Sequence, residues 1–394
     1  MSQQPDNTGD DAVSVSEDQV LDALSNVEDP DLNRDIVSLG FVTDLRICGG
    51  QVAFTINLTT PACPVKDKMK NEAEQFVGAI DGVEQVNVEL DATTQGREIE
   101  GGVEAGSDAS KQEDTYEFEN LNSVKNIVAV ASGKGGVGKS TVAASMALSL
   151  AQDGASVGLM DADLYGPSIP TMFGIEGAKP KATGDKEIVP IEKFGVQTIS
   201  IGFLQQEETD APTIWRGPIA TNMIKQFLSG VMWGELDYLI IDLPPGTGDI
   251  QLTLTQTAPL TGGVIVTTPQ NVSLIDARKG LKMFQKVNVP ILGIVENMSK
   301  FVCPNCEEEH FIFRKGGGKR TAEEFDVPLL GEIPIDSTIA DGMDEGVPFL
   351  TEHPETPAAQ AFIDVSRSVA ARLSTLHLSD RQRSESFSIE WSPS

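Results

Sequence analysis

The chain contains few cysteines, few basic residues and no long hydrophobic stretch. Only 4 of its 394 residues are cysteine, which argues against a secreted disulfide framework and favours a reducing cytoplasm. Residues 1–30 have neither a basic start nor an apolar core, so we expect no signal peptide. No apolar run reaches the roughly 18 residues that a membrane-spanning helix requires. The sequence therefore predicts a cytoplasmic protein without a membrane partner.

Basic side chains are scarce, with 29 Lys and Arg against 59 Asp and Glu and a net charge of −30. So acidic a surface repels nucleic acid and anionic lipid, and the sequence contains no basic run that would reverse this locally. We therefore expect no nucleic-acid partner. Strong acidity also keeps a protein hydrated in concentrated salt, so the composition is compatible with a salt-rich cytoplasm.

Composition divides the chain into five segments. Three of them are predicted to lack a packed core: a polar start (1–15), an acidic linker (92–123) and a polar tail (377–394). Residues 16–91 carry the helix and strand patterns of a small α/β domain, which begins with a capping box at Ser16 and Gln19. Residues 124–376 form the large remaining domain.

The large domain alternates apolar strands with helical patterns. Continuous apolar strands of this kind belong to a parallel sheet that helices cover on both faces, so we predict an α/β, doubly wound, mostly parallel sheet. The predicted strands are Asn126–Ala131, Ser156–Met160, Val196–Ile201, Tyr238–Ile241, Gly263–Thr267, Ile291–Val295 and Leu329–Ile333.

A glycine-rich stretch follows the first of these strands and fits the P-loop pattern G-x-x-x-x-G-K-[ST]. Its glycines let backbone N–H groups converge on phosphate oxygens, and the N-terminus of the following helix adds a favourable partial charge. We predict an ATP site in which Lys139 reaches the β- and γ-phosphates and Ser140 ligates Mg²⁺. The predicted nucleotide-binding residues are Gly133, Lys134, Gly135, Gly136, Val137, Gly138, Lys139, Ser140 and Thr141.

Carboxylates at two strand ends support this site. Asp242 ends the strand Tyr238–Ile241, where a P-loop enzyme places the acid that meets Mg²⁺. Asp161 and Asp163 follow the strand after the P-loop helix, where one of them can position the attacking water. An acid at a strand end is often only a helix cap, but beside a P-loop the catalytic interpretation is favoured.

These motifs resemble a known family. The stretch KGGVGKS, with its second lysine at Lys134, is similar to the deviant P-loop of MinD/ParA-like ATPases. The stretches 161–168 (DADLYGPS), 215–218 (WRGP) and 233–249 (WGELDYLIIDLPPGTGD) resemble the Mrp/ApbC iron–sulfur carriers. This resemblance covers about 120–376, and the small domain resembles the PaaD-like domain often fused to such carriers.

The resemblance implies specific roles. Lys134 would reach across a homodimer to the partner's phosphate, and Asp163 would orient water. Asp242 would hold Mg²⁺, and Asn297, which follows the strand Ile291–Val295, would read the adenine edge. The family also implies an ATPase that transfers an iron–sulfur cluster to apo-proteins, together with cluster assembly factors.

A C-x-x-C pair, Cys303 and Cys306, lies a few residues beyond Asn297. Two thiolates at this spacing converge on one metal centre, but a tetrahedral site or a cluster needs four ligands. Spacing alone leaves open a cluster, a zinc site that recruits His310, a redox dithiol and a structural knuckle. The family resemblance implies a [4Fe–4S] cluster shared by two chains.

Two further cysteines lie in the small domain. Cys63 precedes Pro64 at the predicted start of a helix, where partial positive charge lowers a thiol pKa. It is either a structural residue or an accessory residue in cluster transfer. Cys48, beside the turn Gly49-Gly50, has no predicted role.

Two other functions use a similar P-loop domain. A MinD/ParA-like positioning ATPase needs a partner surface such as an amphipathic membrane helix, which the C-terminal stretch RQRSESFSIEWSPS does not provide. A nitrogenase-reductase-like electron donor spaces its cluster cysteines far apart, unlike Cys303 and Cys306. The interpretation is therefore a cluster carrier, with a positioning ATPase as the alternative.

Overall fold

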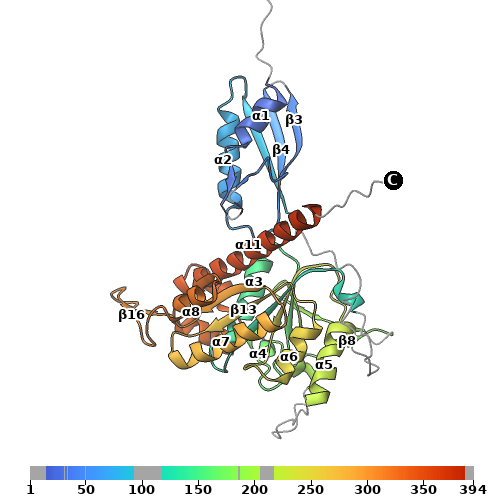
Figure 1. The fold of residues 1–394 in the computed structure, drawn as a ribbon, viewed down its shortest axis with the longest axis vertical. Coiled ribbons are helices and arrows are strands. Elements are labelled where there is room, and N and C mark those ends of the chain that lie inside the picture. The colour runs from blue at the N-terminus through green and yellow to red at the C-terminus, as the bar shows by residue number, and fades with distance from the viewer. Residues whose placement is uncertain are drawn as a thin grey trace, which may run out of the picture. The chain divides into compact units, whose positions relative to one another are not determined.

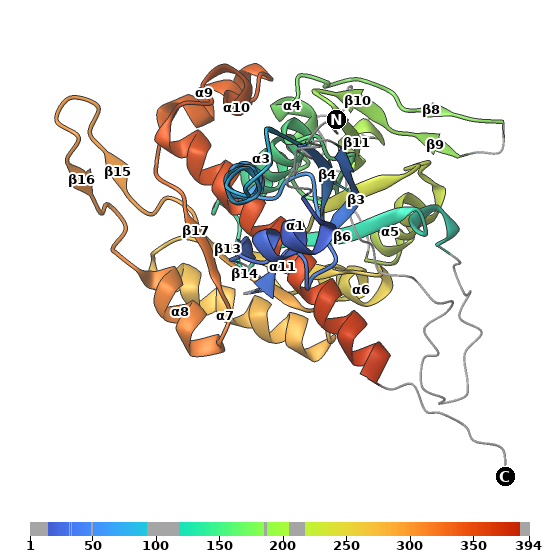
Figure 2. The same cartoon turned by 90° about the horizontal axis from the view of Figure 1, so that it is seen from above.

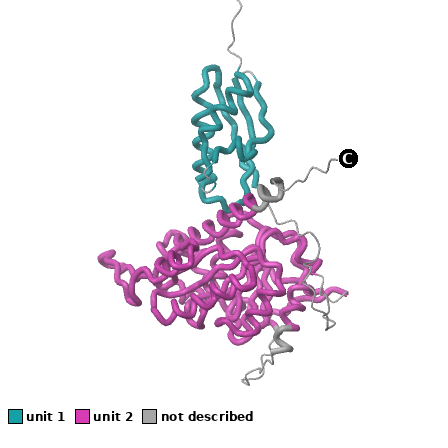
Figure 3. The backbone as a smooth tube through the Cα atoms, viewed as in Figure 1, with its two compact units in different colours: residues 1–94 teal, residues 95–394 magenta. Residues whose placement is uncertain are grey.

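The computed structural model describes residues 15–30, 32, 34–48, 50–92, 118–184, 187–204 and 217–386. They belong to two compact units, residues 1–94 and 95–394 (Figure 3). The predicted polar start, most of the acidic linker and Trp215 and Arg216 of the WRGP motif lie outside the described residues. No described helix is both long and apolar enough to cross a membrane.

The first unit is a small α/β domain in which helix α1 precedes the β3–β4 hairpin in the sequence and helix α2 follows it. Helix α1 begins with the predicted capping box, in which Ser16 and Gln19 satisfy each other's backbone N–H groups. Strand β4 buries its alternate residues Val52, Phe54, Ile56 and Leu58. β4 pairs antiparallel with β3 and parallel with β5. The elements are α1 (Glu17–Leu24), β1 (Glu28–Asp29), β2 (Arg34–Asp35), β3 (Val42–Cys48), β4 (Gln51–Leu58), α2 (Lys66–Gly78) and β5 (Gln85–Ala92).

The second unit is built on one eight-stranded sheet with the order β10-β11-β7-β12-β6-β13-β14-β17. All its strands run parallel except β10, which pairs antiparallel with β11 at one edge. This confirms the predicted doubly wound, mostly parallel sheet. Its strands are β6 (Val124–Ser132), β7 (Val157–Asp161), β10 (Ile191–Lys193), β11 (Val196–Ser200), β12 (Leu236–Asp242), β13 (Gly262–Thr267), β14 (Ile291–Glu296) and β17 (Leu329–Glu332).

Helices cover both faces of this sheet (Figures 1 and 2). The central strands are therefore apolar along their whole length, as residues 127–131 of β6 illustrate, since all are buried. The helices are α3 (Lys139–Gln152), α4 (Ile169–Met172), α5 (Gly217–Gly230), α6 (Asp249–Thr257), α7 (Asn271–Lys286), α8 (Gly317–Phe325), α9 (Ser337–Glu345), α10 (Phe349–Glu352) and α11 (Pro357–Ser386), with short 3-10 turns at Glu119–Leu121 and Ile201–Leu204.

Two short hairpins lie outside the main sheet. Strands β8 (Lys181–Ala182) and β9 (Ile188–Val189) form the first, and β15 (Phe301–Val302) and β16 (Glu309–His310) form the second. The second hairpin projects from the body of its unit (Figure 2) and leads into α8. It carries the C-x-x-C pair.

Two elements of the large domain extend past the predicted segment limits. Helix α11 continues to Ser386, past the predicted start of the tail at 377, because residues 377–386 contain no glycine or proline to end it. Residues 118–123 were assigned to the linker, but Leu121 is buried in the core and Asn120 Nδ2 donates to the Ser229 carbonyl at 2.7 Å. The acidic composition of the long linker window concealed this short apolar anchor.

Candidate nucleotide site and cysteine hairpin

The P-loop lies between the end of β6 and the start of α3, as its motif predicts. Gly138 has φ of 80° and caps α3, a conformation that residues with a Cβ rarely adopt. Two glycines also allow other segments of the domain to lie close to the P-loop backbone. A Cβ on Gly133 would lie 2.1 Å from the Asp276 backbone carbon, and one on Gly138 would lie 2.2 Å from Asn297 Nδ2. The loop is therefore packed against two other segments of the domain.

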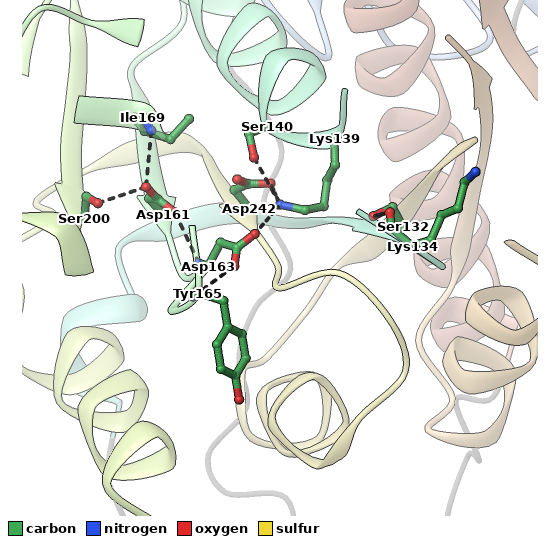
Figure 4. A network of polar contacts seen from close by, with 10 residues as sticks. All are labelled: Ser132, Lys134, Lys139, Ser140, Asp161, Asp163, Tyr165, Ile169, Ser200 and Asp242. Carbon is green, nitrogen blue, oxygen red and sulfur yellow. Dashed lines mark hydrogen bonds and ion pairs between the residues drawn. The ribbon is translucent and has the colours of Figure 1, made fainter. Parts of the chain in front are cut away.

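Lys139 lies in a buried cluster of carboxylates at the carboxyl edge of the sheet (Figure 4). Its Nζ is hydrogen-bonded to Asp242 Oδ1, lies 3.7 Å from Asp163 Oδ2 and donates to Ser140 Oγ at 3.2 Å. Strands β6, β7 and β12 are neighbours in the sheet, which is why residues so far apart in the sequence meet here. In this arrangement Lys139 is bound to carboxylates, so a phosphate that binds Lys139 would have to replace them as its partner.

Burial raises the pKa values of two aspartates in this cluster. Asp161 is fully buried, and desolvation, with the charge of Asp242 adding to it, raises its pKa to about 7. It accepts from Ser200 Oγ at 2.9 Å and from the backbone N–H of Ile169 and Asp163. Burial also raises the pKa of Asp163, whereas the Lys139 charge lowers it. The site therefore holds more carboxylate than the one lysine neutralises.

Asp242 is fully buried, and its Oδ2 has no hydrogen-bond partner among the described residues. An orphaned carboxylate oxygen costs free energy unless a cation or water completes it. Because Ser140 Oγ lies beside the same lysine (Figure 4), the donor set consists of a hydroxyl and a carboxylate. Such hard oxygen ligands fit Mg²⁺.

Lys134 does not join this cluster. Its side chain points away from Lys139 and Asp242 (Figure 4), and its Nζ donates to Gln270 Oε1 at 3.4 Å, just before α7. The structure thus separates the two P-loop lysines, one buried with the carboxylates and one directed elsewhere. Nothing in the sequence indicated the Gln270 contact.

Asn297 is buried directly behind the P-loop. Its Nδ2 donates to the Val137 carbonyl at 2.9 Å, and its Oδ1 accepts from the Met298 backbone N–H at 2.9 Å. Asn297 is therefore hydrogen-bonded directly to the P-loop backbone. The remaining predicted residues, Gly135, Gly136 and Thr141, lie in the loop and the first turn of α3.

Glu296, which precedes Asn297, ties this strand to α8. Its buried carboxylate accepts from the Gly318 backbone N–H, and burial raises its pKa while that hydrogen bond lowers it. A Cβ on Gly318 would lie 2.9 Å from Glu296 Cβ, so the contact needs glycine. Sequence reasoning missed this residue. The available signal was an acid at the end of an otherwise apolar strand.

Cys303 and Cys306 lie in the turn of the β15–β16 hairpin, with Cys306 exposed and Cys303 half-buried. The Cys303 backbone N–H donates to the Glu308 carbonyl at 3.0 Å, and Glu307 N–H donates back to Cys303 at 2.8 Å. Backbone N–H groups of Asn305 and Cys306 donate to the Cys303 sulfur and lower its pKa. The turn thus favours thiolate.

Within the residues that the structure describes, no group of three or more His, Cys, Asp or Glu is arranged to hold a metal, so these thiols gain no third ligand from that part of the chain. His310 pairs with Phe301 in the hairpin ladder and does not complete a set with the cysteines. A closed zinc site within one chain is therefore not formed here.

Cys63 is buried in the core of the first unit beside Val65, and Cys48 is exposed at the end of β3. Within the residues that the structure describes, none of the four cysteines forms a disulfide. The burial of Cys63 agrees with a structural residue, and its accessory role in transfer stays a prediction.

Residues 123–370 match the family described as NUBPL iron-transfer P-loop NTPase, and residues 17–90 match an iron–sulfur cluster assembly family. The iron–sulfur cluster carrier protein of Synechocystis sp. is 45% identical over 364 residues, which span 91% of this chain and 98% of that relative. The carrier protein of Deinococcus radiodurans is 46% identical over 363 residues, 92% of this chain and 97% of that relative. These similarities extend through both units.

Among solved structures, a nucleotide-binding protein from Archaeoglobus fulgidus, in complex with ADP, is 42% identical with a TM-score of 0.52. It covers 58% of this chain, and the match covers 89% of that chain. The structural likeness is therefore to the second unit, in which the P-loop and the cysteine hairpin lie.

Proposed function

Because the chain belongs to the NUBPL iron-transfer family of P-loop NTPases, we propose that it is an ATP-hydrolysing carrier that takes up an iron–sulfur cluster and delivers it to apo-proteins. In this proposal two chains form a homodimer, and Cys303 and Cys306 of each supply the four thiolates of one [4Fe–4S] cluster. Cluster assembly factors load it, and the setting is a reducing cytoplasm, in which cysteines stay reduced.

One observation carries this proposal. The cysteine hairpin offers one exposed and one half-buried thiol and no third ligand among the described residues, so it is an open site that a two-fold axis would close with an identical pair. An open, solvent-facing site suits cargo that must be released, whereas a structural zinc site is closed within one chain.

The nucleotide site supports the ATP-hydrolysing part of the proposed function. ATP would compete with Asp242 for Lys139, because the phosphates offer a stronger charge-assisted partner in the same place. When bound, Mg²⁺ neutralises phosphate charge, and Ser140 and Asp242 are the residues that would hold it. Asp163, beside Lys139, would orient the attacking water.

Asn297 provides a physical link between the two sites. It contacts the P-loop carbonyl of Val137, and the chain runs from it through Ser299 and Lys300 into β15. Ser299 and Lys300 are held by backbone hydrogen bonds to Ile333 and Ile335 on the next strand connection. In the proposal Asn297 reads the adenine edge, so nucleotide occupancy reaches the root of the hairpin over four residues of chain.

Lys134 has a role in trans in this proposal. Its ammonium group is directed away from its own carboxylate cluster, as a lysine that serves a partner's phosphate requires. We expect Lys134→Ala to bind ATP nearly as tightly as wild type and to lose most hydrolysis, measured by phosphate release at saturating ATP. Unchanged hydrolysis would remove the role in trans.

The cluster claim is tested by anaerobic reconstitution of wild type and Cys303→Ala/Cys306→Ala with iron and sulfide. We expect about four irons per dimer in wild type, as the four thiolates of one cluster imply, and none in the variant, with nucleotide binding intact in both. Transfer is read by reactivation of an apo-enzyme that needs a [4Fe–4S] cluster. Tight zinc at one per monomer, without iron uptake, would contradict the proposal.

A further inference from the structure

Helix α7 exposes a regular stripe of side chains. Val272, Ile275, Lys279, Lys282 and Lys286 are spaced by three or four residues, which places them on one side of the helix, and all five are exposed. Val272 is 64% exposed and Ile275 is 52% exposed, so the aliphatic start of the stripe is open to solvent. The opposite side is buried and contains Leu274, Ala277, Leu281 and Phe284.

This stripe is basic in a very acidic protein. Helix α7 contains four basic residues and one acidic residue, and residues 314–320 (RKGGGKR), which lead into α8, contain four basic residues and none acidic. The whole chain carries −30. Helices α7 and α8 lie side by side in both views (Figures 1 and 2), so folding gathers the two basic segments, which start at residues 271 and 314, into one surface.

We name this surface, formed by the exposed side of α7 and residues 314–320, the α7/α8 face. Some of its charges are already paired: Arg278 with Glu324 at 2.6 Å and Lys279 with Asp276 at 2.8 Å. Lys282 and Lys286 are exposed and have no ion-pair partner within the part of the chain that the structure describes. The face therefore keeps an excess of positive charge.

A hollow of about 250 Å³ lies between the two helices on this face. Leu274 and Ile275 contribute aliphatic surface to it, while Arg278 and Arg320 contribute guanidinium groups. A hollow of this size accepts an aliphatic side chain, and the neighbouring cations suit carboxylates on either side of it.

We propose that the α7/α8 face docks an acidic segment of a partner protein, with an aliphatic side chain of that segment in the hollow. Charge complementarity carries the proposal, because a positive surface on a chain of net charge −30 attracts acidic protein selectively. Nucleic acid fits less well, since the rest of the chain repels a polyanion and the face begins with two aliphatic residues. Concentrated salt screens the attraction between the charges, so under that condition the apolar contact in the hollow would hold the partner.

The α7/α8 face lies close to the cysteine hairpin, which suggests which partner binds there; this step rests on the proposed carrier function. The cysteine hairpin leads directly into α8, so a partner bound to the α7/α8 face lies next to the root of the hairpin. Apo-proteins that receive the cluster are the partners that this position would serve.

Binding is measured on the full-length protein without iron, by fluorescence anisotropy with a labelled synthetic peptide of alternating Glu and Leu. We expect Lys282→Glu/Lys286→Glu to weaken binding by about 10-fold or more at low salt. Ile275→Asp should weaken it at about 1 M salt, where charges are screened. A peptide with Ser in place of Leu should lose the binding that remains in high salt.

The matched control is Lys179→Glu/Lys181→Glu, which makes the same charge change at exposed lysines elsewhere on the second unit. An equal loss in both double variants would overturn the proposal, because net charge alone would then explain binding. So would tighter binding of single-stranded DNA or of phosphatidylglycerol vesicles that only the face variant loses. Light scattering that shows loss of self-association in the face variant would assign the face to a second copy instead. Since no iron is present, these outcomes are independent of the cluster claim.

Discussion

The nucleotide site and the cysteine hairpin lie in the same unit and are built in opposite ways. In the nucleotide site Lys139, Asp242 and Asp161 are buried, and the lysine already has carboxylate partners. In the hairpin Cys306 is exposed, and the described residues supply no further metal ligand to the two thiols. A buried site can be prearranged for one small ligand, whereas an exposed and incomplete site can exchange its cargo with another protein.

The largest expected effect concerns the buried cation. Lys139→Ala should weaken ATP binding by about 100-fold, because a charge-assisted contact to phosphate is lost in a dry site. It should also lower the free energy of unfolding of the nucleotide-free protein by about 3–5 kcal/mol, because Asp242 then remains buried without its partner. Isothermal titration calorimetry and urea unfolding measure the two effects.

The double variant Lys139→Ala/Asp242→Asn separates them. It should recover part of the stability, since no unpaired buried charge remains, and recover none of the affinity. The exposed Lys179→Ala is the control and should leave both quantities unchanged. If Lys139→Ala is as stable as wild type, the ion pair of the nucleotide-free site contributes little and the first half of the comparison fails.

A second change acts where the two regions meet. Glu296→Ala removes the buried acceptor of the Gly318 N–H at the start of α8, so the free energy of unfolding should fall by about 1–3 kcal/mol. Glu324→Ala, which breaks the exposed pair with Arg278 on the same helix, should cost no more than about 1 kcal/mol. Urea unfolding measures the loss of free energy of unfolding in both variants. Equal losses would show that the buried contact of Glu296 stabilises the protein no more than the exposed pair does.

The pH dependence of stability tests the carboxylate cluster. The pKa of Asp161 in the folded protein is about 7, against an ordinary value of 3.8, so the folded state binds the proton more tightly. Its contribution to the free energy of unfolding is complete at low pH and is lost as pH rises from about 4 to about 7.

The Asp161→Asn variant should therefore show a shallower fall in the free energy of unfolding over that window, measured by urea unfolding of the nucleotide-free protein at a series of pH values. The asparagine keeps an acceptor for Ser200 Oγ, so the variant should fold. Parallel curves for the two proteins would place the pKa of Asp161 at its ordinary value.

The smallest effect is expected for the thiol that is buried. Cys63 lies in the core of the first unit, and Cys63→Ser should lower the stability of that unit by about 1–2 kcal/mol through the polar hydroxyl that it introduces. Iron loading at Cys303 and Cys306 should not change. Slower delivery to an apo-enzyme with intact loading would instead reveal the accessory role predicted from the sequence.

Much of the candidate site could be predicted because its signals are local. The P-loop motif specifies a strand, a turn and a helix that follow one another in the chain, and β6 and α3 lie where the motif requires. Burial patterns of period two and continuous apolar runs located the strands of the sheet, whose ends then placed Asp161, Asp163 and Asp242 at one edge. The C-x-x-C spacing needed no tertiary information.

By itself the sequence determined the fold class, the phosphate-binding loop and the pair of thiols, since each depends on neighbours along the chain. Only the tertiary structure decided that Lys139 pairs with Asp242, that Asn297 contacts Val137 and that Glu296 holds the start of α8. It also brought the basic residues of α7 next to the basic segment 314–320, which lies elsewhere in the sequence. The physical reason is that these contacts join segments from about 20 to more than 100 positions apart, and strand order, which local patterns do not encode, selects which of them meet.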